Sequence, residues 1–166
     1  MDIAELRDAF TASEQIGERL KLFREDRVRR IEGNDTPTPI AGGAKLVVHV
    51  LPLHARFGET TGDLRRFVAE NEALLNPIRG NPRAGRYNID GYLTYRQPRD
   101  DSPPTSYVQM FRDGILEAVD ASTLLPAGCP EGQRRLRMAA SERMLIECVP
   151  RYVEAQRCFG IAPPWR

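Results

Sequence analysis

The sequence is short of lysine, of paired cysteines and of long apolar runs. Its 166 residues contain three cysteines, Cys129, Cys148 and Cys158, and no C-x-x-C motif. An odd count without that spacing indicates neither a disulfide framework nor a zinc site, so we expect a reducing, cytoplasmic setting. No apolar run approaches the length of a membrane span, and no apolar leader segment follows Met1. We therefore expect no membrane partner.

Neither sign of charge is in useful excess, because 24 Lys and Arg residues oppose 23 Asp and Glu residues. The net charge thus provides no general attraction to nucleic acid, and a nucleic-acid role would need a local basic patch. The cations are nearly all arginine, since lysine occurs only at Lys21 and Lys45. The apolar fraction of 41% and the length are those of one ordinary globular domain.

The motifs of common catalytic and nucleotide-binding classes are also missing. The sequence contains no P-loop, no GxGxxG, no GxSxG and no HExxH. His49 and His54 fall in a predicted strand and a predicted loop, which does not match the spacing of metal ligands. We therefore predict no catalytic residue, no metal and no cofactor, and an enzyme is the less favoured class.

The apolar pattern of the N-terminal segment, residues 1–33, predicts helices. Apolar residues at helical spacing indicate a short helix over residues 1–10. Thr11 and Glu14 fit a capping box that would start a second, longer helix. Gly33 is placed to end that helix as its C′ residue.

Two further helices are predicted later in the chain. Asp63 is placed to cap a shorter helix over residues 63–75, inserted into the sheet-forming region. Ser141 is placed to cap a C-terminal helix over residues 141–160, which Gly160 would end.

Residues 45–140 should supply a four- to five-stranded, mostly antiparallel sheet. Residues 45–52 are apolar on both faces, which favours an interior strand with His49 buried and bonded to one partner. Residues 87–96 alternate as one half-buried strand, and residues 136–140 could form a short fifth strand. With two long helices and one shorter helix packed on the sheet, the predicted fold is a single α+β domain.

A β-hairpin is predicted around Asp113 and Gly114. If these two residues form a type I′ turn, Met110 faces Glu117. Glu117 is then a carboxylate in an otherwise apolar row, with Arg112 diagonally across from it. We favour a structural Glu117–Arg112 pair or an exposed face, and keep a carboxylate held in a cleft as the alternative.

Two groups of residues are the candidate binding sites. Arg79, Arg83 and Arg86 lie on a Gly/Pro-containing loop without an acidic residue between them. We favour a mobile basic loop over a dedicated phosphate site, since the loop leads into a strand and not into a helix N-terminus. The second group consists of polar side chains in or beside apolar strands, namely Asn88, Asp90, Arg112 and Glu117.

Several short motifs resemble one known family. These are VHVLPL, R-x-N-x-D-G from Arg86 to Gly91, and F-R-D-G-x-x-E-A-V from Phe111 to Val119. In this order, and over almost the whole chain, they resemble the region that follows the AlbA_2 (Schlafen-type) domain in many bacterial proteins, which are often labelled "ATP-binding" or "helix-turn-helix domain" proteins. The AlbA_2 domain itself is absent, so the resemblance transfers no catalytic residue and implies a piece of a longer protein.

We therefore expect a non-catalytic accessory or interaction domain of an AlbA_2/Schlafen-like protein. The resemblance implies the parent protein's own AlbA_2 domain, or further copies of the chain, as partners, and nucleic acid or a ligand as the target of the assembly. One alternative is direct binding of nucleic acid or a nucleotide through Arg79, Arg83 and Arg86. A second alternative is a hydrolase that uses Asp90 and Glu117.

Overall fold

The computed structural model describes residues 2–52, 62–80, 84–96, 102–122 and 138–161; the side chains of residues 3–14 and 138–140 are not described. The chain divides into two compact units, Met1–Thr36 and Pro37–Arg166. Among the described residues, no helix is both long enough and apolar enough to cross a membrane.

The first unit is a single helix, α1 (Ile3–Glu32). The predicted break and capping box at Thr11 are therefore wrong, because the helix runs through that residue. One threonine among good helix-forming residues costs well under 1 kcal/mol relative to alanine, which is too little to end a helix. The left-handed C′ residue that follows the helix is Asn34 (φ 58°) and not the predicted Gly33, one residue earlier. Asp35 N then donates to Arg30 O at 2.8 Å and closes the helix end.

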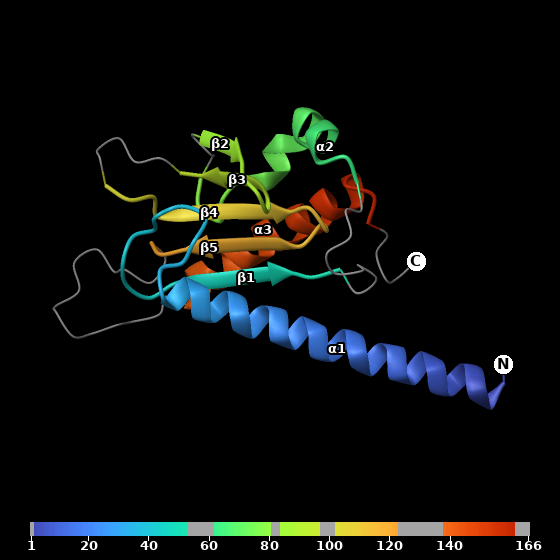
Figure 1. Cartoon of the computed structure of the whole chain (residues 1–166). Coiled ribbons are helices and arrows are strands. Elements are labelled where there is room, and N and C mark those ends of the chain that lie inside the picture. Colours follow the sequence, from blue (N-terminus) through green and yellow to red (C-terminus); the bar gives the residue numbers. More distant parts are fainter. Residues whose placement is uncertain (1, 53–61, 81–83, 97–101, 123–137, 162–166) are drawn as a thin grey trace. The chain divides into compact units, whose positions relative to one another are not determined.

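The second unit is built on a five-stranded antiparallel sheet, which with its helices makes an α+β fold, as predicted (Figure 1). The strands lie in the order β1-β5-β4-β3-β2. Their bounds are β1 (Leu46–Val50), β2 (Ala84–Tyr87), β3 (Gly91–Tyr95), β4 (Ser106–Phe111) and β5 (Leu116–Asp120).

Two of the strand predictions are wrong, one in the position of the strand in the sheet and one in the residues that form it. β1 lies at an edge of the sheet and not in its interior; apolar side chains on both faces require cover above and below, not a neighbour on each side. The fifth strand is β2 and not residues 136–140, because 138–140 belong to a helix. Residues 136 and 137 lie outside the described residues.

The single strand predicted over residues 87–96 is in fact the last residue of β2, a turn over residues 88–90, and then β3. The side-chain oxygen of Asn88 accepts from the backbone N–H groups of Asp90 at 3.1 Å and Gly91 at 2.7 Å. This bonding bends the chain back on itself, as asparagine often does. Asn88 and Asp90 are therefore turn residues. Gly91 is, as predicted, a point of close backbone approach, since a Cβ there would overlap the Met110 carbonyl oxygen.

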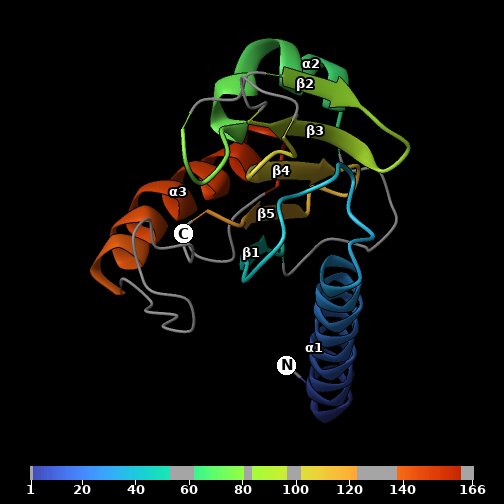
Figure 2. The ribbon, with the colours of Figure 1, turned by 90° about the vertical axis from the view of Figure 1, so that its left-hand side faces the viewer.

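Three helical elements cover one face of the sheet (Figure 2). They are α2 (Leu64–Asn71), the 3₁₀ helix η1 (Glu72–Leu75) and α3 (Met138–Cys158). The predicted cap at Asp63 is confirmed, because its carboxylate accepts from Arg65 N at 3.0 Å and Arg66 N at 3.1 Å. The predicted end of the last helix at Gly160 is confirmed by its left-handed backbone (φ 94°). That helix begins before Ser141, which is therefore not its cap.

The hydrophobic core lies between this helical layer and the sheet. Fully buried Tyr152 of α3 packs with Leu116 and Met110 on the sheet. The Tyr152 hydroxyl donates to Asn76 O at 2.9 Å, just after η1. The hydrogen bond ties α3 to the end of η1, so the two helical segments share one anchor.

The hairpin between β4 and β5 has a three-residue loop, so the predicted two-residue turn is wrong. Phe111 N donates to Ile115 O at 2.8 Å, and Gly114 adopts φ 83°. This pattern is a type I turn followed by a left-handed glycine. The pairing shifts by one residue, so Glu117 faces Gln109 and Met110 faces Leu116. Every residue of β5 therefore faces a β4 residue one position away from the predicted one.

Gly91→Ala should strongly destabilise the protein, because the added methyl group meets a strand carbonyl that cannot move away without breaking the β3–β4 pairing. We expect a loss of about 2 kcal/mol or more in the free energy of unfolding, measured by urea denaturation. Gly42→Ala is the matched control, since nothing lies within 4 Å of its Cβ position. Equal stabilities of the two variants would contradict the observed close approach.

The stability of the protein should fall above about pH 10 in a way that depends on Tyr152. Burial raises the pKa of its hydroxyl above the ordinary value. The unfolded chain therefore loses this proton at lower pH than the folded chain, which favours unfolding by about 1 kcal/mol one pH unit above 10. Tyr152→Phe should reduce the loss of stability between pH 9 and 11 in urea titrations. An unchanged alkaline slope would rule out this contribution.

Candidate functional site

Polar side chains form a buried row across the middle of the sheet, on the face opposite the helical layer. His49 of β1 is paired with Glu117 of β5, and Glu117 with Gln109 of β4. Since directly opposed residues point to the same face, all three side chains lie together. With Tyr107 and Asn88, which bond to members of this row, we call them the polar cluster.

The cluster is held by short hydrogen bonds around Glu117, which is fully buried. Its Oε2 lies 3.0 Å from His49 Nε2, and its Oε1 accepts from the Tyr107 hydroxyl at 2.9 Å. Gln109 and Asn88 are bonded to each other by their amides, with Asn88 Nδ2 donating to Gln109 Oε1 at 2.8 Å. The predicted buried, bonded state of His49 is thus confirmed.

These contacts give Glu117 the chemistry of a structural carboxylate. A buried carboxylate is costly to remove from water unless hydrogen bonds or a cation compensate it. His49 and Tyr107 each direct a polar group at one of its oxygens. Imidazole, phenol and carboxylate could relay a proton, but in this arrangement they face one another inside the domain.

Arg112 does not contact Glu117, so the predicted diagonal pair is wrong. Its Nε donates to Ile89 O at 2.9 Å, and its backbone N–H donates to Asp90 O at 3.0 Å. The turn after β4 is therefore hydrogen-bonded to the turn before β3, and we call this contact the clasp. The clasp joins the R-x-N-x-D-G and F-R-D-G motifs, which are far apart in the sequence, at one end of the sheet.

Asp90 and Glu117 do not form a pair of catalytic carboxylates. Asp90 is exposed in the β2–β3 turn, whereas Glu117 is buried at the centre of β5. β4 lies between their strands, and Glu117 is level with Leu93, three residues along β3 from Asp90. Two carboxylates that act on one bond must both reach it, and these two lie in different environments at different heights of the sheet.

Of the three arginines of the predicted basic loop, the structure describes Arg79 and Arg86, which have different partners. Arg79 is exposed, and its Nε donates to Met144 Sδ at 3.3 Å. Arg86 belongs to β2; it donates to Pro37 O at 2.8 Å and lies 5.8 Å from the Tyr95 ring centroid. Arg83 lies outside the described residues. The predicted loop is therefore shorter than expected, and one of its arginines is a strand residue.

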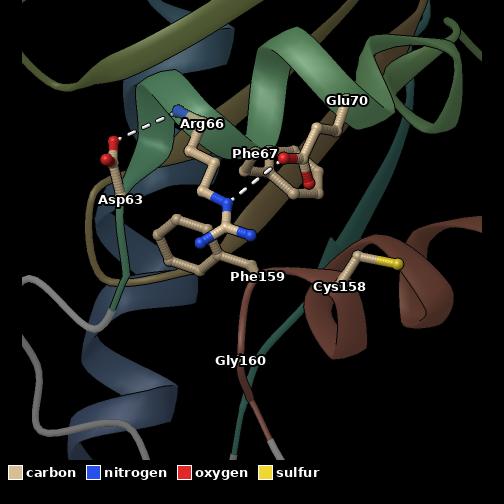
Figure 3. Close-up of a pocket in the computed structure, with 7 residues that line it drawn as sticks. All are labelled: Asp63, Arg66, Phe67, Glu70, Cys158, Phe159 and Gly160. Carbon is tan, nitrogen blue, oxygen red and sulfur yellow. Dashed lines mark hydrogen bonds and ion pairs between the residues drawn. The ribbon is translucent and has the colours of Figure 1, made fainter.

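A separate surface pocket of about 260 Å³ lies between α2 and the end of α3 (Figure 3). Figure 3 shows the Arg66 side chain extending from α2 toward Phe159, with its Nε bonded to Glu70 at 3.2 Å. The rings of Phe67 and Phe159 meet edge to face, 5.7 Å apart. Sequence reasoning missed this pocket because its two walls are distant in the chain.

The pocket also contains the exposed thiol of Cys158. Partial desolvation and the neighbouring Glu154 carboxylate raise the pKa of this thiol above its ordinary value. A raised pKa lowers the fraction of thiolate, so Cys158 is not an activated nucleophile. In the part of the chain that the structure describes, no three His, Cys, Asp or Glu residues are grouped so that they could hold a metal ion.

Comparison of the chain with models of protein families, with curated proteins and with solved structures gives no match. The resemblance to the segment that follows AlbA_2 domains therefore rests on the sequence motifs alone. Among those motifs, the two that form the clasp are now explained by their mutual hydrogen bonds.

Glu117→Ala should lower the free energy of unfolding by about 3 kcal/mol, because it leaves His49 and Tyr107 without their shared partner. Tyr107→Phe should cost about 1 kcal/mol, the usual worth of one hydrogen bond. Both changes in the free energy of unfolding are to be measured by urea denaturation. Glu147→Ala is the control, since the exposed Arg143–Glu147 pair should contribute less than 0.5 kcal/mol. If Glu117→Ala cost no more than this control, Glu117 would have no structural role.

Proposed function

We propose that this chain is a non-catalytic interaction domain, the companion of an AlbA_2 (Schlafen-type) domain in a bacterial protein. It would support self-association, or the engagement of ligand or nucleic acid by that neighbour. The observation that carries the proposal is the clasp. Arg112 donates to the carbonyl oxygens of Ile89 and Asp90, and the Asn88 side chain accepts from Asp90 N in the same turn. The motif residues therefore bond to one another and build part of the scaffold.

The polar cluster supports the same conclusion. Glu117, one of the two carboxylates of the hydrolase alternative, is fully buried with both oxygens in hydrogen bonds. Residues that act on a substrate must reach it, whereas these side chains satisfy one another inside the sheet. The chemistry of the motifs therefore favours a folded platform over an active site.

A second candidate function, direct binding of single-stranded nucleic acid, has its own support. Arg79 and Arg86 are both exposed, and the Arg86 guanidinium lies 5.8 Å from the ring centroid of Tyr95, which is partly exposed. Arginine next to a partly exposed aromatic ring suits the phosphates and bases of a single strand. Arg86 is, however, already bonded to Pro37 O, which limits its reach.

A titration with a labelled single-stranded oligonucleotide at about 50 and 200 mM salt separates the two functions. An interaction domain should show no binding that weakens steeply with salt. The same protein should sediment as an oligomer, or as a complex when the AlbA_2 domain of its parent protein is added.

Steep salt dependence that disappears in an Arg79→Ala/Arg86→Ala double variant would instead establish direct binding. Arg143→Ala/Arg157→Ala is the matched control, because it removes the same charge from exposed positions on α3. A protein that neither self-associates nor binds the AlbA_2 domain would overturn the interaction function.

A further inference from the structure

In the part of the chain that the structure describes, no strand pairs with the outer edge of β2, which leaves this edge available for strand pairing. β2 is the last strand of the sheet (Figure 1). Its residues Gly85, Arg86 and Tyr87 are all exposed. An edge strand presents a row of backbone groups that can pair with another extended chain. The direction of these backbone groups decides where an added strand can bond, and the side chains beside them decide which sequence it can have.

The pairing of β2 with β3 shows which backbone groups of β2 point away from the sheet. Asn88 N donates to Gly91 O across the two strands, so the alternation places Arg86 opposite Leu93 in the next pair whose backbone groups face each other. The backbone N–H and C=O groups of Gly85 and Tyr87 therefore point away from the sheet. Two residues with outward groups can make four hydrogen bonds to an added strand.

The side chains define a chemical preference along this edge. Arg86 points to one face, where its guanidinium donates to Pro37 O at 2.8 Å and pairs with no carboxylate among the described residues, so its charge is uncompensated there. Tyr87 points to the other face, where its ring lies 4.7 Å from that of Tyr92. An added strand would thus meet a cation on one face and the half-exposed ring of Tyr87 on the other.

The same geometry disfavours a second copy of this chain as the occupant. Two β2 strands that pair about a twofold axis, with Gly85 opposite Tyr87, would make all four hydrogen bonds. That register places Arg86 directly opposite Arg86 of the second copy, at the closest type of cross-strand pair. Like charges at such a pair are destabilising.

We propose that the β2 edge docks an extended acidic segment of a partner protein by strand addition. The segment alternates an acidic residue, beside Arg86, with an apolar residue, beside Tyr87. Backbone hydrogen bonds to Gly85 and Tyr87 provide the affinity, and the side chains provide the selection. The inference rests on the proposed interaction function and names the surface and the partner chemistry.

The experiment is an NMR titration of the isotope-labelled full chain with a synthetic peptide of about six residues that alternates valine and glutamate. The amide signals of Gly85 and Tyr87 should shift first and most. A valine–lysine peptide of the same length should cause no shift there. N-methylation of the valine–glutamate backbone should abolish the shifts, because it removes the donors that pair with β2.

Arg86→Glu should weaken the acidic peptide roughly fivefold, since an exposed ion pair is replaced by like charges. The same variant should bind the lysine peptide in preference. Arg143→Glu, at an 83% exposed arginine on α3, is the matched control and should change neither affinity. A change as large in this control would mean that net charge, and not the β2 edge, decides binding.

Other outcomes would overturn the proposal. These are shifts centred away from Gly85 and Tyr87, equal response to both peptides, self-association that Arg86→Glu abolishes, or an oligonucleotide that displaces the peptide. If no peptide shifts these amides while sedimentation still detects a complex with the AlbA_2 domain, the β2 assignment fails and the interaction function stands. If both experiments are negative, both fail.

Discussion

The register of the β4–β5 hairpin decides where the charge of Glu117 lies, and the rest of the sheet depends on it. With Gly114 in the left-handed conformation, the loop contains three residues and Glu117 lies beside His49 and Gln109. A register one residue different would set this carboxylate opposite Met110, whose side chain belongs to the core. Such a carboxylate would be buried without partners, at a cost of several kcal/mol. One backbone conformation thus separates the polar cluster from the core.

The same loop also positions the clasp. Because Gly114 completes the turn, Arg112 leaves β4 with its backbone N–H and its guanidinium both directed at the β2–β3 turn. That turn is in its own right closed by the Asn88 side chain. The two hairpins therefore stabilise each other at one end of the sheet. A change in either turn would disturb both, so the contact between the two motifs needs no shared ligand to account for it.

The fold class, the Asp63 cap and the Gly160 helix end could be predicted because each depends on local bonding. The hairpin register could not, since Asp-Gly suits both two-residue and three-residue loops. What separates the loops is the pairing of Glu117 with His49, 68 residues away in sequence. Matching polar residues across strands would have favoured the observed register, because only that register places Glu117 opposite Gln109. The turn at Asn88 also had a local signal, an asparagine followed three residues later by glycine, which the alternating pattern of residues 87–96 obscured.

An open edge strand is a hazard, and β2 carries both the hazard and its remedy. Gly85 is required there because a Cβ would overlap the hydroxyl of Tyr92, which is bonded to Glu72. Without a side chain at Gly85, little shields the outward backbone groups. A charged residue on an edge strand commonly prevents pairing between identical strands, and Arg86 has that position. The repulsion that keeps two copies apart is also an attraction for a strand of opposite charge. Protection from self-pairing and recognition of an acidic partner would therefore follow from one side chain.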